Sequence, residues 1–205
     1  MIIRFDHITY VCNESRLEQV LTKFASLGYV ESFREIHIPN ISPKLKLLHY
    51  ASRTHSLFFM KKDGSIPVEV ISYEKTTKGI PVVYYDLEGD TFTYNTKDVE
   101  ALKGLYCCLG VKKDIIDSYN VKGVLDKANT YVSFEKVDNP STNLDNEGFT
   151  CPTLFVDSFI KIKTKVEESG YCCTECSPIS INGRDLKIFF IVGKFGEVLE
   201  LISNK

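Results

Sequence analysis

The chain begins with a stretch in which apolar and polar residues alternate. In IIRFDHITYV, residues 2–11, every second side chain falls on the same side of an extended strand, so that His7 shares a face with Phe5. The next stretch, SRLEQVLTKFASLGY, has the period of an amphipathic helix. Its Ser15 and Glu18 have the spacing of a capping box. We therefore predict a strand followed by a helix.

Three more strands are predicted before residue 75. YVESFREIHI, residues 29–38, is rich in β-branched and aromatic residues, and a second β-rich run ends in LFFMKK. The Asp63-Gly64 dipeptide is a turn signal, and IPVEVISY follows it. The predicted order over residues 1–75 is therefore βαβββ.

Residues 148–205 repeat this order. GFTCPTLFV predicts a strand, and FIKIKTKVEESG predicts a helix that ends at Gly170. The runs YCCTECSPISIN, LKIFFIVG and EVLELIS then predict three strands. The last part of the chain is therefore a second βαβββ unit.

The two units share one short passage almost residue for residue. LFFMKKDGSIPVEVIS, residues 57–72, and IFFIVGKFGEVLELIS, residues 188–203, align without a gap. Each has one acidic residue inside its second apolar strand, Glu69 in the first and Glu200 in the second. A buried charge costs several kcal/mol unless it is paired, hydrogen-bonded or bound to a metal. The repeated Glu therefore marks a candidate site.

The middle of the chain begins in the same way but does not complete the pattern. TFTYNTKDVEALKGLYCCLGV predicts a short strand and a helix capped by Thr96 or Asp98, and NTYVSFEKV predicts another strand. We find no fourth strand with a Glu inside it. Residues 76–147 are therefore interpreted as a partial third module or an insertion, with a polar linker, DNPSTNLDNEG, at residues 138–148.

Together these patterns predict an α+β protein. A single βαβββ unit covers one face of its sheet with its helix and leaves the other face open. Two such units are expected to pair their curved mixed sheets around a central cavity, where a repeated inner-face Glu would meet its twin. The predicted division is a first module at residues 1–75, the middle segment at 76–147 and a last module at 148–205. Whether the first module pairs with the middle or with the last segment is left open.

Composition narrows the class of protein. The chain has 205 residues, 43% of them hydrophobic, with a net charge of −2. This balance argues against disorder and against a nucleic-acid-binding surface. The first residues do not resemble a signal peptide, and no stretch is apolar enough for a membrane span. Seven cysteines without a secretory signal indicate free thiols, so we expect a cytoplasmic protein. The lone C-x-x-C within CCTEC is interpreted as packing rather than a redox or zinc motif.

At FDHITYV, followed by the amphipathic helix ending in LGY, and again at VEVISY and LELISN, the sequence resembles the vicinal-oxygen-chelate superfamily. That superfamily includes glyoxalase I, methylmalonyl-CoA epimerase, the fosfomycin and bleomycin resistance proteins and the extradiol dioxygenases. The resemblance covers the first and last modules. It implies one divalent metal ion, Zn, Mn, Ni, Co or Fe, held between the modules by residues of their first and fourth strands.

Carried over to this chain, the implied metal ligands are His7, Glu69 and Glu200. The fourth position departs from the family pattern: alignment by the helix start puts Cys151 there, and alignment by the helix-terminal glycine puts Phe149 there. Neither is His or Gln. A Cys151 thiolate would favour Zn, whereas an absent fourth ligand would fit a metal-free binding member.

The leading functional hypothesis is a metal-dependent, glyoxalase-like lyase, isomerase or epimerase acting on a small oxygenated metabolite. Glu200 is expected to double as the catalytic base. The alternatives are a non-catalytic, bleomycin-resistance-like binding protein, a dioxygenase-like Fe(II) enzyme, and an interaction domain without a site. A homodimer is compatible with the resemblance.

Further residues are candidates for binding the substrate. His49 and Arg53 are placed in a strand leading into the same sheet, where they would contact an oxyanion, although a solvated strand face is the simpler interpretation. The aromatic side chains of the repeated strand would line the cavity. The two that we assign to the substrate are Phe58 and Phe189.

Overall fold

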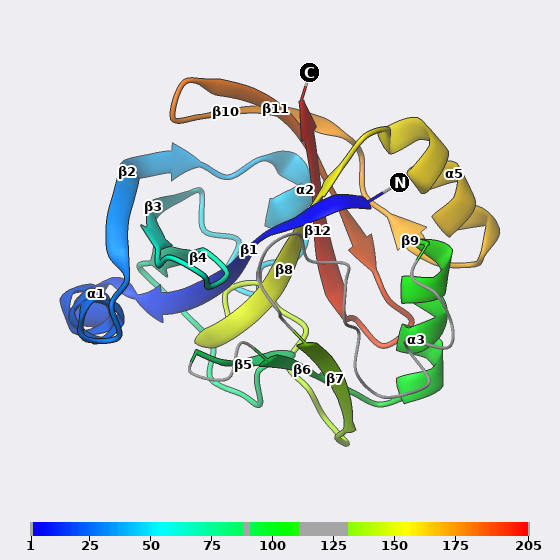
Figure 1. Cartoon of the computed structure of the whole chain (residues 1–205), viewed down its shortest axis with the longest axis horizontal. Coiled ribbons are helices and arrows are strands. Elements are labelled where there is room, and N and C mark those ends of the chain that lie inside the picture. Colours follow the sequence, from blue (N-terminus) through cyan, green and yellow to red (C-terminus); the bar gives the residue numbers. More distant parts are fainter. Residues whose placement is uncertain (1, 88–90, 111–130, 205) are drawn as a thin grey trace.

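The computed structural model describes residues 2–87, 91–110 and 131–204 (Figure 1). Its elements occur in the order expected for two βαβββ units around a middle segment. Within the described residues, no helix has both the length and the apolar character needed to cross a membrane.

The first module carries its helix on one side of four strands. Its elements are β1 (Ile2–Asn13), a short 3-10 helix η1 (Glu14–Arg16), α1 (Leu17–Ser26), β2 (Val30–Pro39), α2 (Ser42–Leu45), β3 (Thr54–Lys61) and β4 (Val68–Tyr73). Val20 and Phe24 are the buried residues of α1. They pack into the same core as Phe58 and Val70 of the sheet.

The predicted capping box does not form. Asn13 caps η1 instead, because its side-chain oxygen accepts the backbone N–H of Ser15 at 3.0 Å. The Ser15 hydroxyl donates back to the same oxygen at 2.7 Å, so it is not available to the helix that follows. At the other end of the helix, Gly28 has a φ of 87°, the left-handed conformation expected at a helix stop.

The last module repeats the arrangement. Its elements are β8 (Gly148–Val156), α5 (Phe159–Glu168), β9 (Cys172–Cys173), β10 (Ser177–Ile181), β11 (Arg184–Val192) and β12 (Val198–Asn204). The buried residues of α5 are Ile162 and Val166, the counterparts of the α1 pair.

The two modules form one continuous sheet in the order β10-β11-β12-β8-β1-β4-β3-β2, and β9 pairs with β11. The first strands of the modules, β1 and β8, pair antiparallel. Each pairs on its other side with the fourth strand of its own module in parallel, β1 with β4 and β8 with β12. The first module therefore joins the last one and not the middle segment.

The middle segment forms a small sheet of its own, with β5 (Val83–Asp86), β6 (Thr91–Thr96) and β7 (Tyr131–Lys136) in sequence order. Asp98 caps α3 (Val99–Cys108) by accepting the Ala101 N–H at 3.1 Å, as one of the two predicted caps. α3 lies beside α5 (Figure 1), and the Tyr171 hydroxyl joins them by donating to the Ala101 carbonyl at 2.7 Å.

Part of the polar stretch predicted as a linker is buried and holds a neighbouring loop in place; we call its Asp145 contacts the Asp145 clamp. The Asp145 side chain has no exposed surface, and its two carboxylate oxygens accept the backbone N–H groups of His49 and Tyr50, each at 2.8 Å. The Leu144 N–H donates to the Leu47 carbonyl at 2.9 Å. This stretch therefore fixes the long loop between β2 and β3, which carries α2.

Candidate functional site

A cavity of about 250 Å³ lies between the inner faces of the two modules. Apolar side chains from both modules form much of its wall, including Phe33, Leu57 and Phe59 from the first and Ile179, Ile188 and Ile202 from the last. The rings of Phe33 and Phe59 stack with their centroids 5.0 Å apart. The polar side chains in the wall are Asp6, His7, Ser32, Lys44, His55, Lys61, Glu69, Asn182, Arg184 and Glu200. All three predicted metal ligands are therefore in the wall of one cavity.

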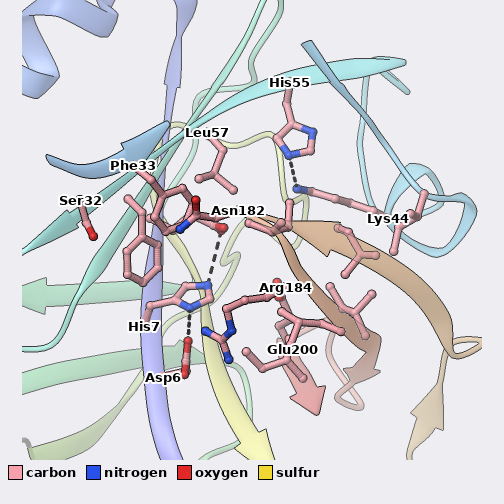
Figure 2. Close-up of a pocket in the computed structure, with 18 of the residues that line it drawn as sticks. Asp6, His7, Ser32, Phe33, Lys44, His55, Leu57, Asn182, Arg184 and Glu200 are labelled. Atoms are coloured by element: carbon pink, nitrogen blue, oxygen red, sulfur yellow. Dashed lines mark hydrogen bonds and ion pairs between the residues drawn. The ribbon is translucent and has the colours of Figure 1, made fainter. Parts of the chain in front are cut away.

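His7 and Glu69 form a pair on adjacent strands. The register places Glu69 opposite Thr9, so His7 lies two residues earlier on the same face of β1. The His7 Nε2 atom lies 3.6 Å from Glu69 Oε2, and the Thr9 hydroxyl donates to the same oxygen at 3.1 Å. His7 Nδ1 lies 3.0 Å from the Asp6 carboxylate (Figure 2). The imidazole is thus flanked by a carboxylate at each nitrogen.

Electrostatics favours the ionised form of this pair. Burial lowers the pKa of His7, but the Glu69 and Asp6 carboxylates outweigh it and hold that pKa well above its ordinary value. Burial raises the pKa of Glu69, but His7 and Lys44 outweigh it and hold that pKa below its ordinary value. The result is an imidazolium–carboxylate pair with both imidazole nitrogens protonated.

Glu200 reaches the cavity from β12. It lies opposite Thr153, as Glu69 lies opposite Thr9, so the two Glu residues occupy equivalent positions. Burial and the Glu69 carboxylate raise the pKa of Glu200. No hydrogen bond to its carboxylate is present among the described residues. The other two acidic side chains in the cavity wall, Asp6 and Glu69, both have partners: Asp6 contacts His7, and Glu69 accepts from Thr9.

The same register identifies the fourth position. Two residues before Thr153 on β8 is Cys151, the counterpart of His7, so alignment by the helix start is correct and Phe149 is not the counterpart. The Cys151 thiol points away from the ion pair: it donates to the Val198 carbonyl at 3.4 Å and to the Pro152 carbonyl at 3.5 Å. Burial and the Glu200 carboxylate raise its pKa well above the ordinary value. As it lies, Cys151 is a hydrogen-bond donor to the backbone.

Lys44, which the sequence patterns did not single out, enters the same cavity from α2 (Figure 2). Its Nζ atom lies 3.5 Å from His55 Nε2 and 5.9 Å from the centre of the Tyr73 ring. Burial lowers the pKa of Lys44, while the Glu69 and Glu200 carboxylates raise it in part. Burial and the nearby ammonium lower the pKa of His55 to about 2, so His55 is neutral.

These residues do not fit a divalent metal ion as they lie. In the part of the chain that the structure describes, no three His, Cys, Asp or Glu side chains are grouped closely enough to hold one. The His7 nitrogens each face a carboxylate, and the Cys151 thiol donates to two backbone carbonyls. Lys44, a cationic side chain, lines the same cavity as Glu69 and Glu200. The predicted ligands converge on one cavity, but their surroundings are those of an ion-paired site.

The four predicted substrate contacts lie elsewhere. His49 and Arg53 are exposed and belong to the loop before β3, not to a strand, and neither lines the cavity. Phe58 and Phe189 are buried on the opposite face of the sheet, where Phe189 packs edge-to-face on Phe159 of α5 with centroids 4.8 Å apart. Their neighbours have the inner face instead: Phe59 lines the cavity, and Phe190 belongs to the inner core.

No family model matches the sequence, and no curated protein matches it. Among solved structures, methylmalonyl-CoA epimerase from Mycobacterium tuberculosis is similar, with 10% identity, a TM-score of 0.49, and coverage of 100% of this chain and 89% of that one. Glyoxalase I from Zea mays is similar with 15% identity and a TM-score of 0.38, over 99% of this chain and 68% of that one. A hypothetical protein from Bacillus halodurans has 12% identity and a TM-score of 0.46, over 98% and 94%.

Two βαβββ modules are joined through their first strands, with their last strands next to them and a shared cavity between their inner faces, so this chain has the paired-module α+β fold that its sequence predicts.

Proposed function

We propose that the cavity binds a small oxygenated anion and that Glu200 transfers a proton on it, as in an isomerase or epimerase. The observation that carries this proposal is the Glu200 carboxylate, which lines the cavity between the two modules without a hydrogen-bond partner among the described residues. Cationic groups around it, His7, Lys44, Lys61 and Arg184, outnumber the acidic ones, Asp6, Glu69 and Glu200. Such a wall favours an anionic ligand.

In the proposed reaction, Glu200 removes a proton from the carbon next to a carbonyl or carboxylate group and later returns it. A carboxyl group with a raised pKa is a suitable proton carrier near neutral pH. Lys44 and Arg184 are the cations available to hold the oxygen on which negative charge develops. His7 and Glu69 face each other as an ion pair, so we assign them the local charge and assign proton transfer to Glu200.

The metal-dependent lyase and Fe(II) dioxygenase hypotheses need a set of metal ligands with free lone pairs. A divalent ion would supply Lewis-acid stabilisation of the same oxyanion. Because the His, Cys, Asp and Glu side chains of the described residues are not grouped closely enough to hold that ion, no step of the proposed reaction depends on one.

Glu200→Gln is expected to lower the rate of proton exchange by a factor of about 10² to 10⁴, the usual contribution of a positioned acid or base. The measurement is loss of the α-proton signal of pyruvate, dihydroxyacetone and related 2-oxo and 2-hydroxy compounds in D₂O, followed by NMR. Glu168→Gln on the exposed side of α5 is the matched control and should exchange at the wild-type rate. Undiminished exchange in Glu200→Gln would rule out Glu200 as the base.

The second candidate is a binding protein without chemistry, and the stacked Phe33 and Phe59 rings in the cavity wall support it. Stacked rings offer a flat apolar surface for a planar ligand. Tight binding of bleomycin or of planar aromatic acids, without exchange in any compound of the panel, would favour this function over the proton-transfer enzyme.

A further inference from the structure

We infer that Lys44 is the built-in cation of the cavity: its ammonium group binds the oxyanion of the ligand and makes the site independent of a divalent metal ion. The identity of the ligand as an oxyanion rests on the proposed function. The part of the inference that concerns metal rests on the placement of Lys44 and does not depend on which ligand binds.

The fold holds Lys44 at the cavity by means of α2, a four-residue helix whose first turn contains the buried Pro43. Asn40 closes the base of the loop, because its backbone N–H donates to the Arg53 carbonyl at 2.8 Å and its side chain donates to the Ser52 carbonyl at 2.7 Å. The Asp145 clamp fixes the far side of the loop. Lys44 therefore projects from a helix whose flanking loop is held at both ends by hydrogen bonds.

The surroundings of the ammonium group suit a ligand contact. The His55 Nε2 atom, 3.5 Å from Lys44 Nζ, can accept one of the ammonium N–H groups. Among the described residues, no carboxylate lies within 4 Å of Nζ. An ammonium group has three N–H donors. Donors therefore remain for an oxyanion in the cavity that Lys44 lines.

The same position works against a metal ion. A divalent ion held by Glu69 and Glu200 would lie in the field of a lysine ammonium close to both carboxylates. Lys44 also lines a second, smaller pocket of about 10 Å³ together with Glu200, Thr150 and Cys151. Lys44 thus lines the same small pocket as Glu200 of β12 and Cys151 of β8.

The first test is titration of the purified full-length protein with MnCl₂ by calorimetry, for the wild type, Lys44→Met, and Lys44→Met combined with Glu200→Gln. Mn²⁺ is chosen because it prefers oxygen and nitrogen ligands and avoids the free thiols. We expect no stoichiometric binding to the wild type, one bound ion in Lys44→Met, and loss of that ion in the double variant. One Mn²⁺ per wild-type chain, or none in a folded Lys44→Met protein, would overturn the inference.

The second test is oxalate and pyruvate binding, measured by calorimetry in the presence of EDTA. Lys44→Met is expected to weaken binding at least tenfold, and Lys44→Arg to keep it within about threefold, because arginine retains a charged donor. Lys46→Met, an exposed position just after α2, is the control and should bind as the wild type does. Unchanged binding in Lys44→Met contradicts the oxyanion role. Failure of the wild type to bind either anion counts against the proposed function, and the Mn²⁺ titration then decides the role of Lys44 by itself.

Discussion

Replacing His7 with methionine is expected to destabilise the protein by about 3 kcal/mol, the usual cost of removing one partner of a buried ion pair. The Glu69 carboxylate would remain in the cavity wall with the Thr9 hydroxyl as its close hydrogen-bond donor. His7→Met combined with Glu69→Met should return to within about 1 kcal/mol of the wild type, because no uncompensated charge is then left. Urea unfolding of the three variants completes a double-mutant cycle.

An exposed ion pair provides the control for this cycle. Arg34 contacts Glu31 through two hydrogen bonds of 2.7 and 2.8 Å, a closer contact than that of His7 with Glu69. Because the Arg34 side chain is 59% exposed, Arg34→Met should destabilise the protein far less than His7→Met does. Equal effects of Arg34→Met and His7→Met would show that burial does not govern the cavity pair.

The cost of His7→Met should also depend on pH. The pKa of His7 is raised above its ordinary 6.5, so its contribution to stability is complete below pH 6.5 and is lost as the pH rises. The pKa of Glu69 is lowered from its ordinary 4.5, so its contribution is complete above pH 4.5 and is lost as the pH falls. The difference in unfolding free energy between wild type and variant should therefore be largest between pH 4.5 and 6.5. A difference that grows above pH 8 would contradict an imidazolium–carboxylate pair.

Asp145→Asn is expected to destabilise the protein by about 3 kcal/mol although it hardly changes the shape of the side chain. Each Asp145 oxygen accepts one backbone N–H, from His49 and from Tyr50. An asparagine would turn its NH₂ group toward one of these donors, which leaves a buried N–H without an acceptor and removes the charge from the other bond. Urea unfolding measures the loss.

Asp145→Asn should also reduce oxalate binding, because the clamp fixes the loop that carries Lys44. Asp138→Asn, an exposed position in the same polar stretch, is the control and should change neither stability nor binding. A stable Asp145→Asn protein would show that the loop is held by other contacts.

The repeated modules could be predicted because their signals are local. Alternation of side chains fixes which residues face one side of a strand, and the same alternation recurs in both modules. Glu69 and Glu200 were found in this way, since a carboxylate inside an apolar strand is visible in the sequence itself. The structure confirms that both line one cavity.

Alternation fails where a strand is irregular. The pairing of β1 with β8 shifts register between Phe5 and His7. Phe5 consequently packs in the core beneath the helices, although strict alternation had placed it on the face of His7. Phe58 and Phe189 show a related difficulty. Each is followed by a second Phe that points to the opposite face of the sheet, and the residue type does not say which of the two faces the cavity.

The two βαβββ units, their order and the acidic residue common to their last strands could be predicted from the sequence, because the spacing of apolar and polar side chains along each element is a local signal. Tertiary structure alone decided that β1 pairs with β8, that Cys151 is the counterpart of His7, and that Lys44 and Asp145 belong to the site and its support. Those placements depend on which strand edges meet and on how a loop is folded back by a segment about 100 residues away. No local period of side chains carries that information, so residues such as Lys44 became visible only when the two modules had closed around the cavity.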